Sequence, residues 1–194
     1  MKKLTSLAVL FIFTLSCSPQ SGVSSQDKKP VGSEISPQAQ AQTTKGWREI
    51  FLTSSPGVLG LRGEDEQAKV WGVMMDVASP SGVITFIAER NGETRVCTST
   101  GHRILGGYIA RNEAKRFVSE AEKHLESMKP TTSFPYPEVG RIKFYVRTRD
   151  GVYTAEADEE ELVHERHALS PLFFAGNEAL TVFRTARGPA KPND

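Results

Sequence analysis

The stretch KVWGVMMDVASPSGVITFIAERNGETRVCT, residues 69–98, decides the fold. Residues 69–78 form an apolar run, the polar turn signal at 79–82 interrupts it, and residues 83–90 form a second run rich in apolar side chains. Asn91-Gly92 follows, a dipeptide that two-residue hairpin turns favour because both turn residues adopt a positive φ. The pattern predicts three consecutive antiparallel strands.

The position of that turn sets an expected register. Counting outward from it places Arg90 opposite Glu93, a favourable cross-strand pair, and Phe86 opposite Cys97. Cys97 is then a small buried side chain in mid-strand. Because both faces of this hairpin carry apolar residues, we expect it to be central in the sheet and covered on both sides.

Three helices are expected around these strands. Residues 47–51 carry apolar side chains at helical spacing ahead of the first strand. A second helix, capped by Asn112, carries an apolar stripe at spacings of three and four and ends at Lys129-Pro130. Ser170-Pro171 is typical of the start of a third helix, with Pro at its first position.

A second hairpin is expected between the last two helices. Residues 141–147 alternate apolar with charged or aromatic side chains, as in a strand with one face on a core. Asp150-Gly151 predicts a turn that places Lys143 opposite Asp158. The acidic run that continues from there to Glu161 lacks the alternation and the glycine of a calcium loop, so we expect a solvated strand end. A solvated loop is also expected at the acidic residues 64–66.

The predicted order is therefore helix, three strands, helix, two strands, helix. Such a chain most simply forms an α+β fold, with a single antiparallel sheet of about five strands and packed helices. By analogy only, this order resembles that of roadblock and profilin-like domains. We place the domain at residues 47–187 and expect a flexible tail at 188–194.

The N-terminus has the organisation of an export signal. Lys2 and Lys3 precede the apolar run Leu7–Leu15, and small Ser16 follows it. The run is far shorter than the roughly 18–20 residues that a membrane-spanning helix needs. Residues 1–16 are therefore expected to be a cleaved signal peptide.

The end of this signal, Thr14-Leu15-Ser16-Cys17, resembles the lipobox of bacterial lipoproteins, although Thr14 stands where Leu is usual. The resemblance implies cleavage before Cys17 and lipid on its thiol, and two or more acyl chains anchor a protein stably. Because Ser18 follows rather than Asp, it also implies the cell envelope, and the outer membrane in a host with two membranes. The alternative is an ordinary secretory signal in which Cys17 is incidental.

The stretch after Cys17 predicts a tether. Residues 17–46 comprise the lipidated cysteine and a segment dominated by Ser, Gln, Pro and Gly, which lacks the apolar surface needed to fold. About 29 such residues reach on the order of 30 Å. Loss of Lys2 and Lys3 with the signal changes the formal charge from +1 to −1. A near-neutral chain has no electrostatic footprint for nucleic acid, so no nucleic-acid partner is expected.

As a whole, residues 47–187 resemble an uncharacterised family of small bacterial proteins. The resemblance is carried by KVWGVMMDVASPSGVITFIAERNGE, by GHRILGG with the helix after it, by TTSFPYPEVGRIKFYVRTRDGVYTAEADEEEL and by HALSPLFFAGNEAL. The family has no assigned activity, and its members are usually cytoplasmic. The resemblance implies a single domain and no mechanism.

Two clusters could carry enzyme chemistry. Cys97 and His102 are close enough in sequence for a thiol–imidazole pair, but a mid-strand cysteine is rarely an activated thiolate. His164 and His167 lie among Glu161 and other acids and are weak candidates for a metal, since structural zinc needs four converging ligands. We expect a solvated loop there, with a histidine docked on the following helix cap.

Two loops could bind a ligand or a partner. Gly101, Gly106 and Gly107 precede a predicted helix, whose free amides could hold an anion, but no Lys-Ser/Thr follows as in a P-loop. The aromatic residues that we expect in loops suit a recognition surface, although each could simply cap the core. They are Tyr108, Phe134 and Tyr136.

The sequence therefore predicts a membrane-anchored lipoprotein whose domain is a binding or regulatory module acting through protein contacts. The membrane, reached through lipid on Cys17, and an envelope protein are the expected partners. No catalytic set and no cofactor are expected. The alternatives are a hydrolase or metal-dependent enzyme using Cys97/His102 or His164/His167, and a purely structural envelope component.

Overall fold

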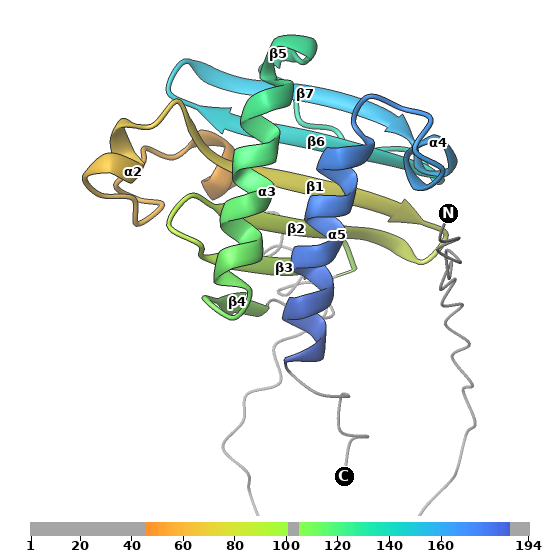
Figure 1. The fold of residues 1–194 in the computed structure, drawn as a ribbon, viewed down its shortest axis with the longest axis horizontal. Coiled ribbons are helices and arrows are strands. Elements are labelled where there is room, and N and C mark those ends of the chain that lie inside the picture. Colours follow the sequence, from red (N-terminus) through yellow and green to blue (C-terminus); the bar gives the residue numbers. More distant parts are fainter. Residues whose placement is uncertain (1–45, 101–104, 187–194) are drawn as a thin grey trace, which may run out of the picture. The chain divides into compact units, whose positions relative to one another are not determined.

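A computed structural model describes residues 46–100 and 105–186. They form an α+β fold around one open antiparallel sheet, in the order β4-β3-β2-β1-β6-β7-β5 (Figure 1). The α+β class and the single antiparallel sheet predicted from the sequence are confirmed. The strands are β1 (Val70–Ser79), β2 (Gly82–Glu89), β3 (Thr94–Thr98), β4 (Leu105–Gly107), β5 (Lys129–Thr131), β6 (Arg141–Thr148) and β7 (Gly151–Asp158).

Two long helices lie side by side across one face of the sheet, α3 (Arg111–His124) and α5 (Ser170–Thr185) (Figure 1). The shorter helices are α2 (Glu64–Gln67), the 3-10 turn η1 (Leu125–Ser127) and α4 (Glu159–Val163), and residues 46–53 are also helical. In the described part of the chain, no helix combines the length and the apolar character that crossing a membrane requires. The predicted signal, Cys17, the tether before residue 46 and the tail lie outside the described residues.

The larger core lies between the sheet and the two long helices. Phe86 of β2 stacks on Phe117 of α3 with 6.0 Å between ring centroids. Gly176 lets α5 approach closely, since a Cβ there would lie 3.0 Å from the Phe117 ring and from Met75 Sδ. This tight crossing explains why the third predicted helix carries a glycine in its middle.

A second core covers the opposite face of the sheet, where the segment before β1 packs. Phe51 lies over Gly72, at which a Cβ would be 2.8 Å from the Phe51 ring and 2.7 Å from the carbonyl oxygen of Ala88. The central hairpin is thus covered on both faces, as expected. The buried members of this core are Phe51, Leu52, Leu59, Leu61, Trp71, Met74, Ile87, Tyr145 and Val152.

The register predicted for the first hairpin is wrong by one residue. The loop has three residues rather than two, because Glu89 N–H donates to Glu93 O at 2.8 Å. Only Gly92 of the Asn-Gly pair has a positive φ, at 87°, while Asn91 Oδ1 accepts the N–H of Glu93. A turn closed by a left-handed glycine after two ordinary residues is the usual three-residue hairpin.

A shift by one residue places every side chain of β3 on the face of the sheet opposite to the predicted one. Cys97 stands opposite Thr85, and Phe86 stands opposite Val96. Cys97 therefore lies on the face covered by residues 46–62, away from the two long helices. The predicted Arg90–Glu93 pair is not formed, and Arg90 instead pairs with Glu122 of α3 at 3.0 Å.

The second hairpin is shifted by two residues from the prediction. Its loop is Arg149-Asp150, so Thr148 pairs with Gly151 and Lys143 stands opposite Glu156 rather than Asp158. A shift by two keeps every side chain on its predicted face, because side chains alternate with a period of two. Lys143 therefore still faces a carboxylate of the neighbouring strand, as expected, but that carboxylate belongs to Glu156.

Several element boundaries differ from the prediction. Helix α3, which is the second helix predicted from the sequence, begins at Arg111 without a side-chain cap from Asn112 and ends at His124. Two short strands, β4 and β5, raise the expected five strands to seven. The acidic runs expected to be a loop and a strand end are the helices α2 and α4, consistent with the favourable position of acidic side chains in a first helical turn.

Candidate functional site

The outer edge of β7 is only partly covered by another strand. The short strand β5 pairs with β7 only at Val152–Thr154, whereas β7 continues to Asp158. Pro130, opposite Tyr153, has no N–H, so the β5 bonds fall on the residues to either side, Val152 and Thr154. Along an antiparallel strand, the main-chain N–H and C=O groups of successive residues point alternately to the two sides of the strand. Glu156 is two residues after Thr154, so its main-chain groups also point outward, beyond the end of β5.

Glu156 N–H and C=O have no hydrogen-bond partner among the described residues. On the inner side of β7, Glu156 lies opposite Lys143 of the neighbouring strand β6. An unpaired strand edge is a template for another extended chain unless it is covered. β5 covers one half of this edge and leaves the other half available.

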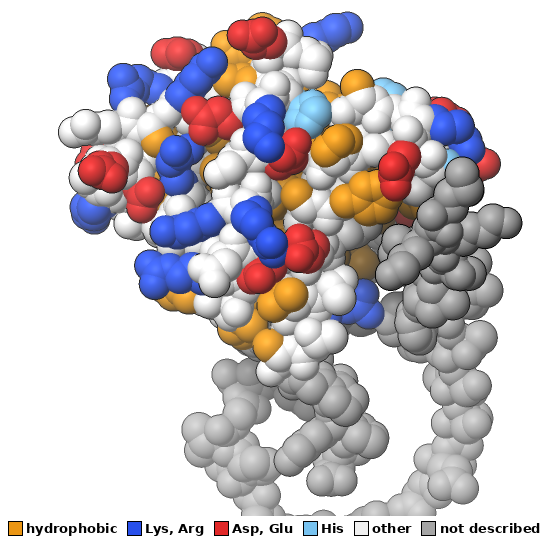
Figure 2. Space-filling model, viewed as in Figure 1, with side chains coloured by type: hydrophobic (Ala, Val, Ile, Leu, Met, Phe, Trp, Pro, Cys, Tyr) orange, Lys and Arg blue, Asp and Glu red, His pale blue; other side chains and the backbone are white. Residues whose placement is uncertain are grey.

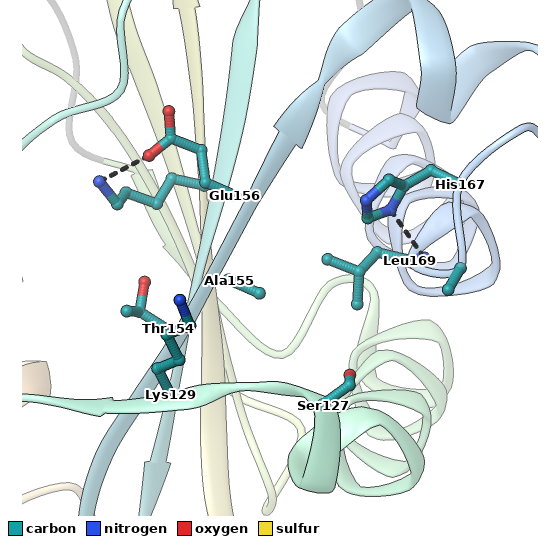
Figure 3. A pocket seen from close by; sticks show the side chains of 9 residues that line it. Ser127, Lys129, Thr154, Ala155, Glu156, His167 and Leu169 are labelled. Carbon is teal, nitrogen blue, oxygen red and sulfur yellow. Dashed lines mark hydrogen bonds and ion pairs between the residues drawn. The ribbon is translucent and has the colours of Figure 1, made fainter.

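A pocket of about 480 Å³ lies against this free edge (Figure 3). Figure 3 shows the β7 strand between two groups of side chains, with Thr154 and Lys129 to one side and Ser127, His167 and Leu169 to the other. The register explains the division, because Lys129 pairs with Thr154 and so shares its face of the sheet. The pocket therefore straddles an edge strand.

The first side of the pocket is basic. Lys143 Nζ lies 2.7 Å from Glu156, and Arg141 Nε lies 2.6 Å from the same carboxylate. Although partial burial alone would raise it, hydrogen bonds from Lys143 and Arg141 hold the pKa of Glu156 below its ordinary value. Glu156 thus forms ion pairs with two cations. Lys129 is exposed and forms no ion pair with a described residue.

A second hollow of about 430 Å³ continues from this side of the pocket. It is lined by Tyr136, Glu138, Arg141, Lys143 and Glu156, so the Lys143–Glu156 pair belongs to both. Tyr136 is 39% exposed and its ring lies over the Arg48 guanidinium, 4.2 Å from the ring centroid. The two hollows therefore adjoin at this ion pair, between β6 and β7.

The histidines proposed as metal ligands hold main-chain groups instead. His167 Nδ1 accepts the N–H of Leu169, the residue before α5, at 3.1 Å, so the predicted docking of a histidine on this helix end is confirmed. His164 Nδ1 lies 2.8 Å from the carbonyl oxygen of Glu160. In residues 46–100 and 105–186, no three His, Cys, Asp or Glu side chains converge as a metal site would need.

The structure does not support a nucleophilic Cys97. Its side chain is 0% exposed, and burial, with Asp76 nearby, raises the pKa of the thiol to about 12. A thiolate nucleophile needs a lowered pKa and access to solvent. His102, its suggested partner, lies outside the described residues.

The two predicted recognition loops also differ from expectation. Gly106 and Gly107 belong to β4 and pair with Arg95 and Thr94, rather than forming a loop, while Gly101 lies outside the described residues. Tyr108 follows β4, where Arg111 lies over its ring at 5.1 Å.

The other two aromatic residues belong to the connection between β5 and β6. Phe134 packs edge-on against Tyr145 with 5.8 Å between ring centroids. Phe134 therefore caps the second core, whereas Tyr136 lines the second hollow.

Comparisons with protein-family models, with curated proteins and with solved structures find no match to this chain. The sequence contains one signal for the β7 edge that pattern analysis did not use. Lys129-Pro130-Thr131 reads as a helix terminator, but a proline is also tolerated in a strand at the edge of a sheet.

Proposed function

We propose that this chain is a membrane-anchored lipoprotein of the cell envelope whose folded domain binds a partner protein. The domain binds by adding an extended segment of that partner to the free half of the β7 edge. The observation that carries this proposal is the outward main chain of Glu156 beside a pocket of about 480 Å³. Strand addition of this kind derives its affinity from main-chain hydrogen bonds and its specificity from flanking pockets.

The surroundings of this edge favour a protein ligand over a small metabolite. Glu156, Lys143 and Arg141 already form ion pairs with one another, which leaves the outward main chain of Glu156 and the Lys129 ammonium group as groups of the pocket open to a ligand. The helix-bearing face seen in Figure 2 has charges of both signs interspersed, with hydrophobic side chains between them, and so offers no single-sign patch on that side. Specific binding is then best explained by the strand edge itself.

The N-terminal sequence supports the location of this module. Cys17 follows a short apolar signal, and a polar stretch separates it from the start of the domain. Lipid on Cys17 would keep the domain within on the order of 30 Å of the membrane surface. In a host with two membranes, Ser18 after the cysteine favours the outer membrane.

A pair of substitutions at one position tests the binding proposal. Glu156→Pro removes the outward N–H and blocks an added strand, yet leaves the bonds to β6 intact, because those bonds belong to the neighbouring residues. Glu156→Ala removes the same carboxylate and keeps the N–H. Tagged chains are crosslinked in living cells, and we expect the same partner with wild type and Glu156→Ala but not with Glu156→Pro. Equal recovery with both variants would overturn strand addition.

The anchor has its own test. Cells are labelled with a fatty-acid analogue, and the chain is compared with a Cys17→Ala form. We expect label and membrane association in the wild type and neither in the variant. Equal label in both forms would overturn lipidation of Cys17 without touching the binding proposal.

A further inference from the structure

The two sides of the β7 edge differ in chemistry, and this difference limits which segment can bind. Side chains of any strand added to β7 alternate between the two faces of the sheet. On one face they meet Lys129, Thr154 and the Lys143–Glu156 pair. On the other face they meet Ala155, Ala168 and Leu169.

On its basic face, the pocket of about 480 Å³ is lined by two cations, Lys129 and Lys143, and by one carboxylate, Glu156. Arg141 and Lys143 both form ion pairs with Glu156, and Arg141 also lies 3.0 Å from Asp158. Lys129 adds a further positive charge, and no described acidic side chain lies within ion-pair distance of it. Figure 3 shows Lys129 beside Thr154, in the part of the pocket that borders the free edge.

The opposite face of the site is largely apolar, and Ser127 and His167 are its polar members. Ala155 is partly buried against the main core, and Leu169 is 4% exposed, so neither projects far from the surface. His167 stands beside them with its Nδ1 occupied by Leu169 N–H, and a neutral ring then carries its proton on Nε2 as a donor. Apolar side chains fit this face, because Ala155, Ala168 and Leu169 line the pocket of about 480 Å³ there.

We infer that the partner segment alternates carboxylate-bearing side chains, facing Lys129, with apolar side chains, facing Ala155 and Leu169. This inference rests on the proposed strand addition and identifies the chemistry of the segment. The main-chain bonds hold the segment at the edge, and the alternation fixes its register, because a slip by one residue would place carboxylates on the apolar face. Like charge from Lys or Arg at the same positions would be repelled by Lys129.

Synthetic peptides test this inference on the purified full-length lipoprotein in detergent micelles. Three labelled peptides of about eight residues alternate valine with glutamate, with serine or with lysine, and binding is followed by fluorescence anisotropy. We expect the glutamate peptide to bind about tenfold more tightly than the serine peptide and the lysine peptide to bind weakest. Lys129→Glu should remove or reverse this order, whereas Lys115→Glu, the same charge change on the exposed surface of α3, should leave it unchanged.

The Glu156 variants separate failure of this inference from failure of the proposed function. If Glu156→Pro abolishes binding that Glu156→Ala retains, but the peptides bind equally or Lys129→Glu keeps the preference for glutamate, the inferred chemistry is wrong and strand addition stands. If Glu156→Pro and Glu156→Ala bind every peptide alike, strand addition and this inference both fall. Self-association of the chain that peptides cannot displace would also overturn the inference, since a second copy would then occupy the edge.

Discussion

Arg48, at the start of the described chain, forms a buried ion pair with Asp76 in the middle of β1. Arg48 is 7% exposed and Asp76 is 0% exposed. Asp76 also accepts the hydroxyl of Thr85 at 2.6 Å, while Arg48 Nη1 donates to Phe134 O at 3.0 Å. The pair therefore joins the segment that follows the proposed tether to the sheet and to the connection before β6.

Loss of one partner of this ion pair should cost far more stability than loss of both. Arg48→Ala leaves the Asp76 carboxylate buried and unpaired, so we expect the free energy of unfolding to fall by about 3–5 kcal/mol. Arg48→Met combined with Asp76→Leu replaces both charges with apolar side chains and should recover most of that loss. Urea denaturation measures both variants, and an equal loss in the two would contradict this account of the pair.

Glu89 should make stability depend on pH below neutrality. Burial raises the pKa of Glu89 from 4.5 to about 7 against the opposing charge of Arg95, and no described residue bonds its Oε2. The folded state then holds a proton that the unfolded state has released between these values. The contribution of Glu89 to the free energy of unfolding is therefore fully present below pH 4.5. It is lost as pH rises through 7, by up to about 3 kcal/mol.

A neutral side chain at that position removes this pH dependence. The free energy of unfolding of Glu89→Gln should rise relative to that of the wild type as pH increases from 4.5 to 7, because glutamine has no proton to release. Urea denaturation of both chains at several pH values measures the difference. Parallel stability curves across this range would mean that Glu89 has an ordinary pKa in the folded protein.

Gly72 should be intolerant of even one added carbon. A Cβ at this position would lie 2.7 Å from Ala88 O and 2.8 Å from the Phe51 ring, so Gly72→Ala should destabilise the fold by about 1–3 kcal/mol. Gly106→Ala is the control, because its nearest contacts are at 3.4 Å. Thermal unfolding compares the two, and equal melting temperatures would show that the segment over β1 packs less tightly than described.

Cys97 should be unreactive in the folded protein. Its thiol is fully buried with a pKa of about 12, so a disulfide reagent at pH 8 should modify it at least about 100-fold more slowly in buffer than in denaturing urea. The Cys17→Ala form isolates this thiol, because the sequence has two cysteines. Rapid modification under native conditions would restore Cys97 as a candidate nucleophile.

The sequence predicted the elements of this fold better than their pairing. The long helices and the five longer strands follow from apolar periodicity, which depends on local residues alone. The register of the first hairpin was wrong because Asn91-Gly92 fits both a two-residue and a three-residue loop. The bond from Glu93 N–H to Asn91 Oδ1, which accompanies the longer loop, is not visible in the residue types.

The proposed binding edge was missed for a related reason. β5 has three residues and no periodicity, so only its pairing with β7 identifies it as a strand. Lys129 and Glu156 become neighbours of one pocket through that pairing, although 26 residues separate them along the chain. Burial of Arg48 was equally hidden, because a charged residue in a short helix is ordinarily exposed.

Amide hydrogen exchange at Glu156 tests strand addition most directly, with Thr154 of the same strand as an internal control. Thr154 pairs with Lys129 of β5, so its amide should exchange slowly with or without ligand. The Glu156 amide should exchange fast in the free chain and at least about tenfold more slowly when the glutamate–valine peptide is bound. An unchanged Glu156 rate under conditions where the peptide is bound would show that the ligand does not pair with this edge.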